Sequence, residues 1–314
     1  MTQMYTNSIL LSLSLIGLVL IGNVRAAPSE QFPVVLKYHM GPVLSNNITV
    51  HLIWYGSWSS GEKRIIRAFI NSISASQSPS PSVAQWWKAL ETYTDLTGSK
   101  VTQSVTLGQE KNDRLSHGRK LTRLAVQSVI STAIRAKTNP LPADPTGGLY
   151  LVLTSSDIIV EGFCRSICGF HYVTFPSIVG YTLPFAWVGN SEKMCPSLCA
   201  FPFVVPEYMQ GVKALKPPNG QPGVDAMISV IGHELAELAT NFLRNGWYAG
   251  DDPNFQTEVG DLCEGLYGRG GGGAYVGEIL TDATGAAYNL NGYRRKFLVQ
   301  WIYSNVGNRC VGPN

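Results

Sequence analysis

The stretch IGHELAELATN, residues 231–241, decides the fold more than any other in this sequence. Each residue of an α-helix advances by about 100°, so His233 and Glu237 lie one turn apart on the same face. Bulky apolar and small side chains fill two further faces: Met227, Ile231, Leu235, Leu238 and Phe242 are bulky, and Gly232, Ala236, Ala239 and Thr240 are small. This pattern predicts a helix over 224–243 that packs on two sides and holds His233, Glu234 and Glu237 in a groove.

The same residues resemble the HExxH zinc motif of metalloproteases, with Glu in place of the second His. Zinc accepts carboxylate oxygen as well as imidazole, so this replacement is chemically permissible. About 20 residues downstream, Glu258 and Asp261 stand at a spacing that resembles the gluzincin pattern. The resulting hypothesis makes His233, Glu237 and Glu258 the metal ligands and Glu234 the general base on a metal-bound water. Asp261 would fix the tautomer of His233 by a hydrogen bond without itself binding the metal. The implied cofactor is zinc, no other cofactor is indicated, and the implied architecture is zincin-like.

A structural interpretation of the HExxE pattern stands beside this one. Glu is common on helices, and a buried His that is hydrogen-bonded to a carboxylate is a frequent feature of protein cores. Whether the protein is an enzyme therefore stays open at this point. The other histidines, His39, His51, His117 and His171, are isolated in sequence, and surface or hydrogen-bonded core positions explain them better than catalysis. The glycine-rich run 268–273 lacks the preceding strand and the Lys-Ser/Thr of a phosphate-binding loop.

The N-terminus has the features of a cleavable export signal. An apolar run spans 9–21, and no charged side chain precedes Arg25. The run is shorter than the roughly 20 apolar residues that a membrane span needs. Small residues at Val24-Arg25-Ala26 place cleavage near Ala26. We expect residues 1–26 to be a signal peptide and 27–314 a single secreted domain with no membrane span; an uncleaved anchor is the alternative.

Composition excludes some classes of partner. The chain has 24 basic and 21 acidic residues, and charged residues make up 14% of it, below the usual quarter. This balance gives no electrostatic reason to expect nucleic acid or an anionic membrane as partner. Asn47-Ile48-Thr49 is the only N-glycosylation sequon, so we expect a glycan at Asn47.

Six cysteines follow the signal segment, an even number in an oxidising compartment. They are Cys164, Cys168, Cys195, Cys199, Cys263 and Cys310. The sequence does not choose among their pairings. We expect the two CxxxC clusters to be linked to each other and Cys263 to Cys310. A Cys₄ zinc site built from the two clusters is the alternative.

Strand-like and helix-like segments alternate along the chain. Strands are predicted over 34–38, 48–55, 101–107, 149–153, 170–175 and 185–188, and helices around 65–73, from 82 and over 121–136. The segment 202–223, rich in Pro and Gly, is predicted to be loop, and 295–303 is strand or helix. No repeat or shift in composition marks a domain boundary. The expected fold is a single α/β (α+β) domain with a mixed sheet flanked by helices and stapled by disulfides.

Several short motifs are similar to those of the plant EXORDIUM-like family, also called the phosphate-induced family. They cover essentially the whole exported chain and keep the order of all six cysteines. The motifs are KYHMGP at 37–42, WYGSW at 54–58, EGFC at 161–164, CGFH at 168–171, AWVGNS at 186–191, CPSLCA at 195–200 and the tail from Cys263 to Cys310.

The resemblance implies a secreted protein of the apoplast and cell wall, linked to cell expansion and growth under brassinosteroid or phosphate control. Its partners would be cell-wall components or apoplastic proteins. The resemblance implies no particular biochemical activity. Two alternatives follow from the residues: a secreted zinc-dependent metallopeptidase with a variant HExxE site, and a module that binds cell-wall polysaccharide through exposed aromatics. The aromatics available are Trp54, Tyr55, Trp58, Trp86 and Trp87, of which helical spacing makes the last two better core candidates.

Overall fold

A computed structural model describes residues 34–313 of the chain. The predicted signal peptide, residues 1–26, lies outside this part. Among the described residues, no helix combines the length and the apolar character that crossing a membrane requires.

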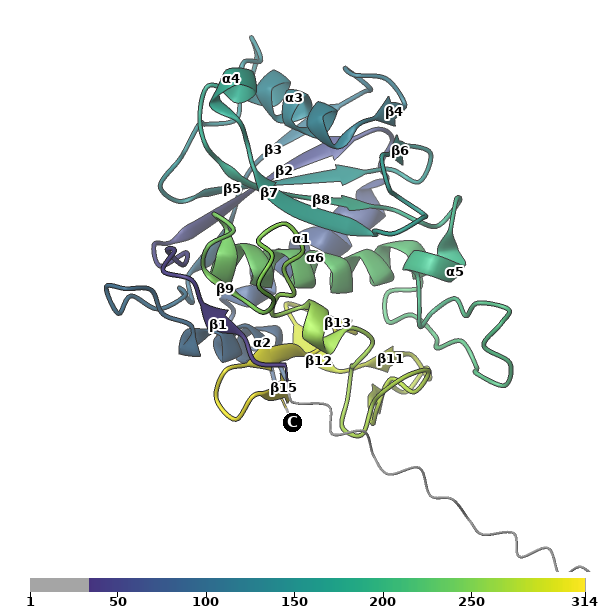
Figure 1. Cartoon of the computed structure of the whole chain (residues 1–314). Coiled ribbons are helices and arrows are strands. Elements are labelled where there is room, and N and C mark those ends of the chain that lie inside the picture. The colour runs from purple at the N-terminus through teal and green to yellow at the C-terminus, as the bar shows by residue number, and fades with distance from the viewer. Residues whose placement is uncertain (1–33, 314) are drawn as a thin grey trace, which may run out of the picture. The chain divides into compact units, whose positions relative to one another are not determined.

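A five-stranded sheet forms the centre of the described part, with the strand order β3-β2-β5-β8-β7 (Figure 1). Its strands are β2 (Ile48–Tyr55), β3 (Val105–Asp113), β5 (Gly148–Thr154), β7 (Gly169–Val173) and β8 (Pro184–Gly189). Neighbouring strands run parallel except β7, which pairs antiparallel with β8 at one edge. The expected mixed sheet in an α/β protein is therefore confirmed.

The sheet separates two hydrophobic cores, because successive side chains of each strand point to opposite faces. On β2, Leu52 and Trp54 enter the core shared with α1 (Ser60–Ile73) and α6 (Pro222–Asn241). Ile53 and Tyr55 enter the opposite core, against α3 (Arg123–Ile134). Figure 1 shows α3 on one side of the sheet and α1 with α6 on the other. Both faces are covered, which explains why the inner strands β2, β5 and β8 are nearly continuous apolar runs, whereas the edge strand β3 is mostly polar.

The helix predicted over 224–243 is α6. Pro222 occupies its first turn, where the missing N–H costs nothing. The Asp225 carboxylate then accepts hydrogen bonds from the Gln221 backbone and from both the backbone and side chain of Asn219, which fixes the helix start. Only three of its 20 residues escape full burial: Pro222, Val230 and His233. The prediction that this helix packs on two sides is confirmed.

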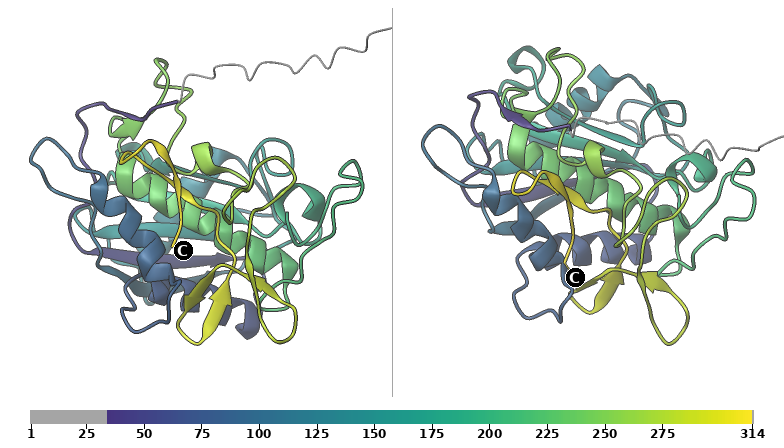
Figure 2. Two further views of the ribbon diagram at one scale, coloured as in Figure 1. Left: turned by 90° about the horizontal axis from the view of Figure 1, so that it is seen from below. Right: turned by 60° about the horizontal axis from the view of Figure 1, so that its bottom comes forward.

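One side of α6 contacts β7 and β8. C-terminal residues, among them Val299 and Gln300, lie against another side. Figure 2 shows these yellow segments crossing the green helix. The Gln300 backbone N–H donates to Ser229 Oγ on α6 at 3.0 Å. Gly232 makes this approach possible, because a Cβ built there would lie 3.1 Å from both Trp86 and Val299. The small-residue face of the helix therefore has a packing function.

The remaining helices are short. Ser59 and Ser82 cap α1 and α2 with capping boxes, and the predicted helix start near Ser82 is confirmed. The short helices are α2 (Val83–Lys88), η1 (Ala89–Thr92), α4 (Pro176–Val179), α5 (Pro196–Cys199) and η2 (Asp261–Cys263).

The small strands pair locally or join distant parts of the chain. They are β1 (Lys37–Tyr38), β4 (Lys120–Leu121), β6 (Ile159–Val160), β9 (Trp247–Tyr248), β10 (Leu280–Thr281), β11 (Ala287–Tyr288), β12 (Leu290–Gly292), β13 (Arg295–Phe297), β14 (Ile302–Ser304) and β15 (Arg309–Val311). The segment 34–38 is therefore strand only at its end, where β1 pairs with β9, and 295–303 contains parts of two strands.

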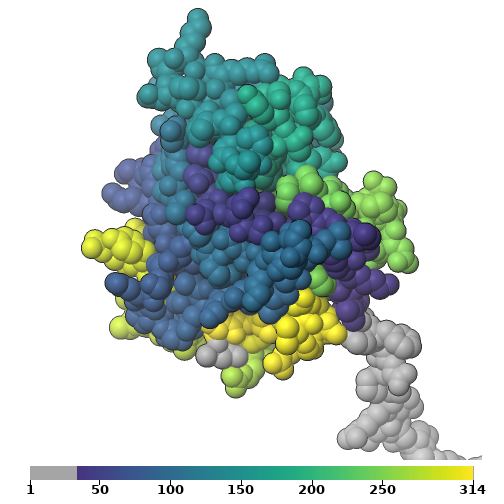
Figure 3. All heavy atoms as spheres, turned by 90° about the vertical axis from the view of Figure 1, so that its left-hand side faces the viewer, coloured from purple at the N-terminus to yellow at the C-terminus, as the bar shows by residue number. Residues whose placement is uncertain are grey.

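An early part of the chain, which includes Trp86 and Tyr93, packs against the C-terminal segments. Figure 3 shows the blue early segments directly above the yellow C-terminal ones. The Trp86 indole donates to the Gln300 carbonyl, and the Tyr93 hydroxyl donates to the Tyr303 carbonyl. Both rings are fully buried. Four of the five aromatic residues considered for sugar binding are core residues, because Trp54, Tyr55, Trp86 and Trp87 are buried. Trp58 is half-buried, and polysaccharide binding stays a prediction.

The predicted disulfide linkage is confirmed. The bonds join Cys164 to Cys195, Cys168 to Cys199 and Cys263 to Cys310. No cysteine among the described residues is free, so the alternative Cys₄ zinc site is wrong. Asn47 is exposed immediately before β2, and its glycosylation stays a prediction.

The zincin-like architecture expected from the HExxE pattern is not supported. The pattern specifies one helix and the direction of three of its side chains. It does not specify the sheet, and any buried helix packed against a sheet can carry it. What the structure supports is the broader class, a mixed α/β fold with three disulfides.

The disulfide Cys263–Cys310 should contribute strongly to stability, because it closes a loop of 47 residues at the C-terminal layer. Loop-closure entropy predicts that the double variant Cys263→Ser/Cys310→Ser loses about 4 kcal/mol in the free energy of unfolding. Denaturant titration of the secreted protein measures this loss. A loss below about 1 kcal/mol would show that other contacts hold the C-terminal layer in place.

Candidate functional site

Helix α6 presents three polar side chains toward a cavity. His233 and Glu237 share a face, as the one-turn spacing predicted, and His233 Nε2 lies 3.0 Å from Glu237 Oε1. Glu234 and Glu237 are buried, and His233 is half-buried. Two carboxylates and an imidazole are therefore fixed on a rigid, almost fully buried helix.

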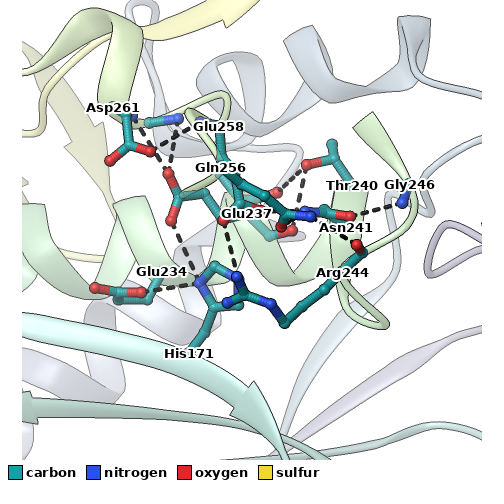
Figure 4. Close-up of polar contacts among 12 residues, drawn as sticks. His171, Glu234, Glu237, Thr240, Asn241, Arg244, Gly246, Gln256, Glu258 and Asp261 are labelled. Carbon is teal, nitrogen blue, oxygen red and sulfur yellow. Dashed lines mark hydrogen bonds and ion pairs between the residues drawn. The ribbon is translucent and has the colours of Figure 1, made fainter. Parts of the chain in front are cut away.

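Strand β7 brings a second imidazole, His171, to the same carboxylates. Its Nδ1 lies 3.2 Å from Glu234 Oε2 and 3.3 Å from Glu237 Oε2, and its Nε2 lies 3.4 Å from Glu258 Oε2 (Figure 4). The side chain is only 5% exposed. Nε2 is buried and has no hydrogen-bond partner. The Glu258 carboxylate is the group that faces this nitrogen, close to it but outside hydrogen-bond geometry.

The loop between β9 and η2 closes the site from the other side. The Glu258 carboxylate accepts a hydrogen bond of 2.6 Å from the Asn241 side chain at the end of α6. The amides of Gly260 and Asp261 both donate to Glu237 Oε1 at 3.3 Å. Asp261 Oδ1 lies 3.5 Å from His233 Nε2. The loop thus adds two carboxylates and orients a third.

The structure distributes the predicted residues differently from the hypothesis. His233, Glu237 and Asp261 form one group of possible ligands, and His171, Glu234 and Glu237 form another. Glu258 contacts His171 instead of joining the group around His233. Asp261, predicted to sit outside the ligand shell, supplies an oxygen within the His233 group. The roles of Glu234 as base and of His233, Glu237 and Glu258 as ligands stay predictions.

Two glycines permit the close approach of strand and loop to α6. A Cβ at Gly169 would lie 2.7 Å from Glu234 Oε1, and a Cβ at Gly260 would lie 2.7 Å from His233 Cγ. Neither position has a positive φ, so space and not backbone conformation selects glycine there. The fold has thus made room for a cluster of charged groups within its core.

Burial and charge act against each other on both imidazoles. Burial alone lowers the pKa of His171, but the carboxylates of Glu258, Glu234 and Glu237 raise it well above its usual value. Burial likewise lowers the pKa of His233, and Glu237 and Asp261 more than reverse this effect. Negatively charged groups therefore surround both rings, and they favour positive charge there, either on the imidazole itself or on a bound metal ion.

The two helix carboxylates respond in opposite directions. Burial raises the pKa of Glu234. Burial also acts to raise the pKa of Glu237, but the nearby His233 and His171 rings lower it well below its ordinary value. Glu237, which lies between the two rings, is thus held as an anion more strongly than Glu234.

The cluster lines a cavity of about 800 Å³. The wall comes from both sides of the α6–sheet junction and includes the polar cluster, several aromatic rings and two arginines: Phe170, Tyr172, Phe175, Phe201, Tyr267, Arg123 and Arg244. A cavity of this size accepts a small molecule or part of a larger chain.

His171 is the residue that sequence reasoning missed. The relevant pattern was present, because residues 170–175 were predicted to be a strand and successive side chains of a strand alternate. Phe170 and Tyr172 pack into the core of the α3 side, which directs His171 to the α6 side. The missing information was which element covers that face of β7.

The donor set suits a divalent cation such as zinc. Imidazole and carboxylate are both common zinc ligands, and the donor atoms in each group lie within 4.8 Å of one another. Glu234 and Glu237 are buried and, among the charged side chains of the described residues, pair only with imidazole rings, so a bound cation would offset their negative charge. His171, Glu234, Glu237, His233 and Asp261 are the residues that could hold a metal.

An α/β fold with a buried cluster of imidazoles and carboxylates defines the general class of this protein. Its family is shown by comparison with known proteins. The family model described as the phosphate-induced protein 1 conserved region matches residues 36–313, so the chain belongs to the phosphate-induced protein 1 family, which includes the EXORDIUM-like proteins. The resemblance seen in the sequence is confirmed.

Similar proteins occur in plants and align over most of their length. Protein EXORDIUM-like 3 of Arabidopsis thaliana is 61% identical over 89% of this chain and 83% of its own. Protein EXORDIUM-like 5 of the same plant is 56% identical over 89% and 78%. Protein PHOSPHATE-INDUCED 1 of Nicotiana tabacum is 37% identical over 88% and 87%. No solved structure matches.

The space left by Gly260 gives a direct test of the site's packing. In Gly260→Ala the new methyl group would collide with His233 and Glu237, so we expect a loss of about 1–3 kcal/mol in the free energy of unfolding. Thermal or denaturant unfolding of the secreted variant measures it. Gly61→Ala is the matched control, because its Cβ would meet nothing within 3.4 Å and its helical position tolerates alanine. Equal stability of the two variants would contradict the close approach of the loop to α6.

Proposed function

We propose that this protein is secreted and acts in the apoplast and cell wall in the regulation of cell expansion and growth, under brassinosteroid or phosphate control. Membership of the phosphate-induced protein 1 family supports this, as do the plant relatives named EXORDIUM-like and PHOSPHATE-INDUCED. Three disulfides are in keeping with an oxidising compartment. Its partners in this proposal are cell-wall components or apoplastic proteins.

The molecular activity in this proposal is the binding of a divalent cation, with zinc as the first choice, in the cavity beside α6. One observation carries it: Nδ1 of His171 and Nε2 of His233 lie 3.0–3.3 Å from oxygens of Glu234 and Glu237, two buried carboxylates that no lysine or arginine pairs with in the described residues. The negative field that these groups create is costly in a buried site and is relieved by a cation.

A metal-dependent hydrolase is the second candidate, and the cavity next to the cluster favours it over a purely structural metal site. A zinc ion in such a site would supply Lewis acidity to a substrate and acidify a bound water. The residues of the chain have separate tasks in this candidate. His171 and His233 offer ring nitrogens, Glu237 lies between them, and Asn241 holds Glu258 in place. The aromatic wall would exclude water from a bound substrate.

Cation binding predicts a stoichiometric metal and a metal-dependent melting temperature. The purified secreted protein should contain zinc or a similar ion by elemental analysis. At a hundredfold excess of cation over Kd, binding stabilises by about 2.7 kcal/mol, so removal by a chelator should lower Tm by about 5 °C. His171→Ala should bind less metal than the wild type, and chelator should lower its Tm by less.

His117→Ala is the matched control, since that histidine lies outside the cavity and contacts Thr132. It should retain the metal and the chelator response. A wild-type protein without metal, whose melting temperature is unaffected by added zinc or by chelator, would refute cation binding. The proposed role in growth is tested separately, by expressing the wild type and His171→Ala in a plant that lacks the protein and measuring cell length. Unrestored cell length with the wild type would refute that role.

A further inference from the structure

The two carboxylate oxygens of Glu237 face different imidazoles. Oε2 lies 3.3 Å from Nδ1 of His171, and Oε1 lies 3.0 Å from Nε2 of His233. The two rings come from different elements, β7 and α6. Glu237 therefore lies between two nitrogen donors, with one oxygen directed at each.

Each side of Glu237 completes a separate set of three donors. The first set consists of His171, Glu234 and Glu237, all buried. The second consists of His233, Glu237 and Asp261, and the Asp261 side chain is 42% exposed. Glu237 is the only residue common to both sets. The two sets thus form an inner and an outer compartment that share one carboxylate.

The charges of the cluster match a pair of divalent cations. Glu234, Glu237, Glu258 and Asp261 carry four negative charges when ionised. Among the described residues, their ion pairs involve only His171 and His233, and no lysine or arginine lies within ion-pair distance. Two divalent cations supply four positive charges and leave both imidazoles neutral, the state in which they ligate metals.

We propose that the cavity binds two divalent cations, with Glu237 as the carboxylate that bridges them. The inner cation takes His171 and Glu234 as further ligands, and the outer cation takes His233 and Asp261. This rests on the cation binding proposed above and specifies it further. Mixed imidazole and carboxylate donors favour Zn²⁺ or Mn²⁺ over the oxygen-only preferences of Ca²⁺ and Mg²⁺.

Glu258 has a positioning role in this arrangement. Its carboxylate lies 3.4 Å from the nitrogen of His171 that points away from Glu234 and Glu237, and Asn241 fixes it through a hydrogen bond of 2.6 Å. A carboxylate on the far nitrogen of a ligating imidazole sets its tautomer and orientation. Glu258 and Asn241 thus support the inner set, and the outer set is the more exposed of the two because of Asp261.

Paired cations define a type of chemistry. Two-metal sites in hydrolytic enzymes place their ions about 3.5–4 Å apart and stabilise both the attacking and the leaving oxygen. Each proposed cation has three protein ligands, which leaves positions free on the side of the 800 Å³ cavity.

The decisive experiment counts cations in the secreted full chain. The protein is stripped by chelator and titrated with Zn²⁺ and Mn²⁺ by isothermal calorimetry, and bound metal is measured by elemental analysis. We expect two cations per chain for the wild type, one for His233→Ala, and fewer than one for Glu237→Gln. Glu264→Gln, which alters an exposed carboxylate of the cavity wall outside both sets, should retain two.

Asp261→Asn is a second test variant for the case that the other variants do not fold. We expect it to fold because this side chain is partly exposed. It should raise the Kd of the outer cation at least tenfold and leave the Kd of the inner cation unchanged. With Mn²⁺, the wild type should give the electron paramagnetic resonance signal of a spin-coupled pair. One cation per wild-type chain, or two that are not coupled, would overturn the bridged pair and leave single-cation binding standing. No bound cation would overturn both proposals.

Discussion

The burial of charged groups along one face of α6 is the constraint on which the rest of the structure depends. A helix that carries Glu234 and Glu237 away from water needs compensating groups from every element packed against it. Strand β7 supplies His171, and the loop before η2 supplies two amides and Asp261. The packing of the core and the assembly of the site are therefore a single problem, solved by the same contacts.

Local structure was predicted well from the sequence, because helix and strand periodicity depend on residues that are close together in the chain. The strand 48–55 and the pairing of the cysteine clusters were predicted as found, and α6 was predicted within two residues at either end. The shared face of His233 and Glu237 also followed from helix geometry alone. The zincin-like architecture was not supported, because one helix pattern cannot specify how a sheet is arranged around it.

The composition of the site depended on tertiary contacts that no local rule supplies. His171 is 62 residues from His233 in sequence and belongs to a strand whose role at the sheet edge follows from its antiparallel pairing with β8. Similarly, the spacing of Glu258 and Asp261 from α6 showed that this loop returns to the helix. It did not show which of the two carboxylates would face His233, because spacing in sequence does not specify the conformation of the loop.

A site built this way also explains why the C-terminal layer is tied so firmly to α6. The Gln300 side chain donates to the Gly260 carbonyl, its backbone donates to Ser229, and Cys310 is bonded to Cys263. These contacts fix the loop whose amides orient Glu237. Like charges held close together in a core repel one another, and only a rigid frame keeps them at a geometry that a cation can use. The extensive packing around α6 is what allows an acidic cluster to persist inside the protein.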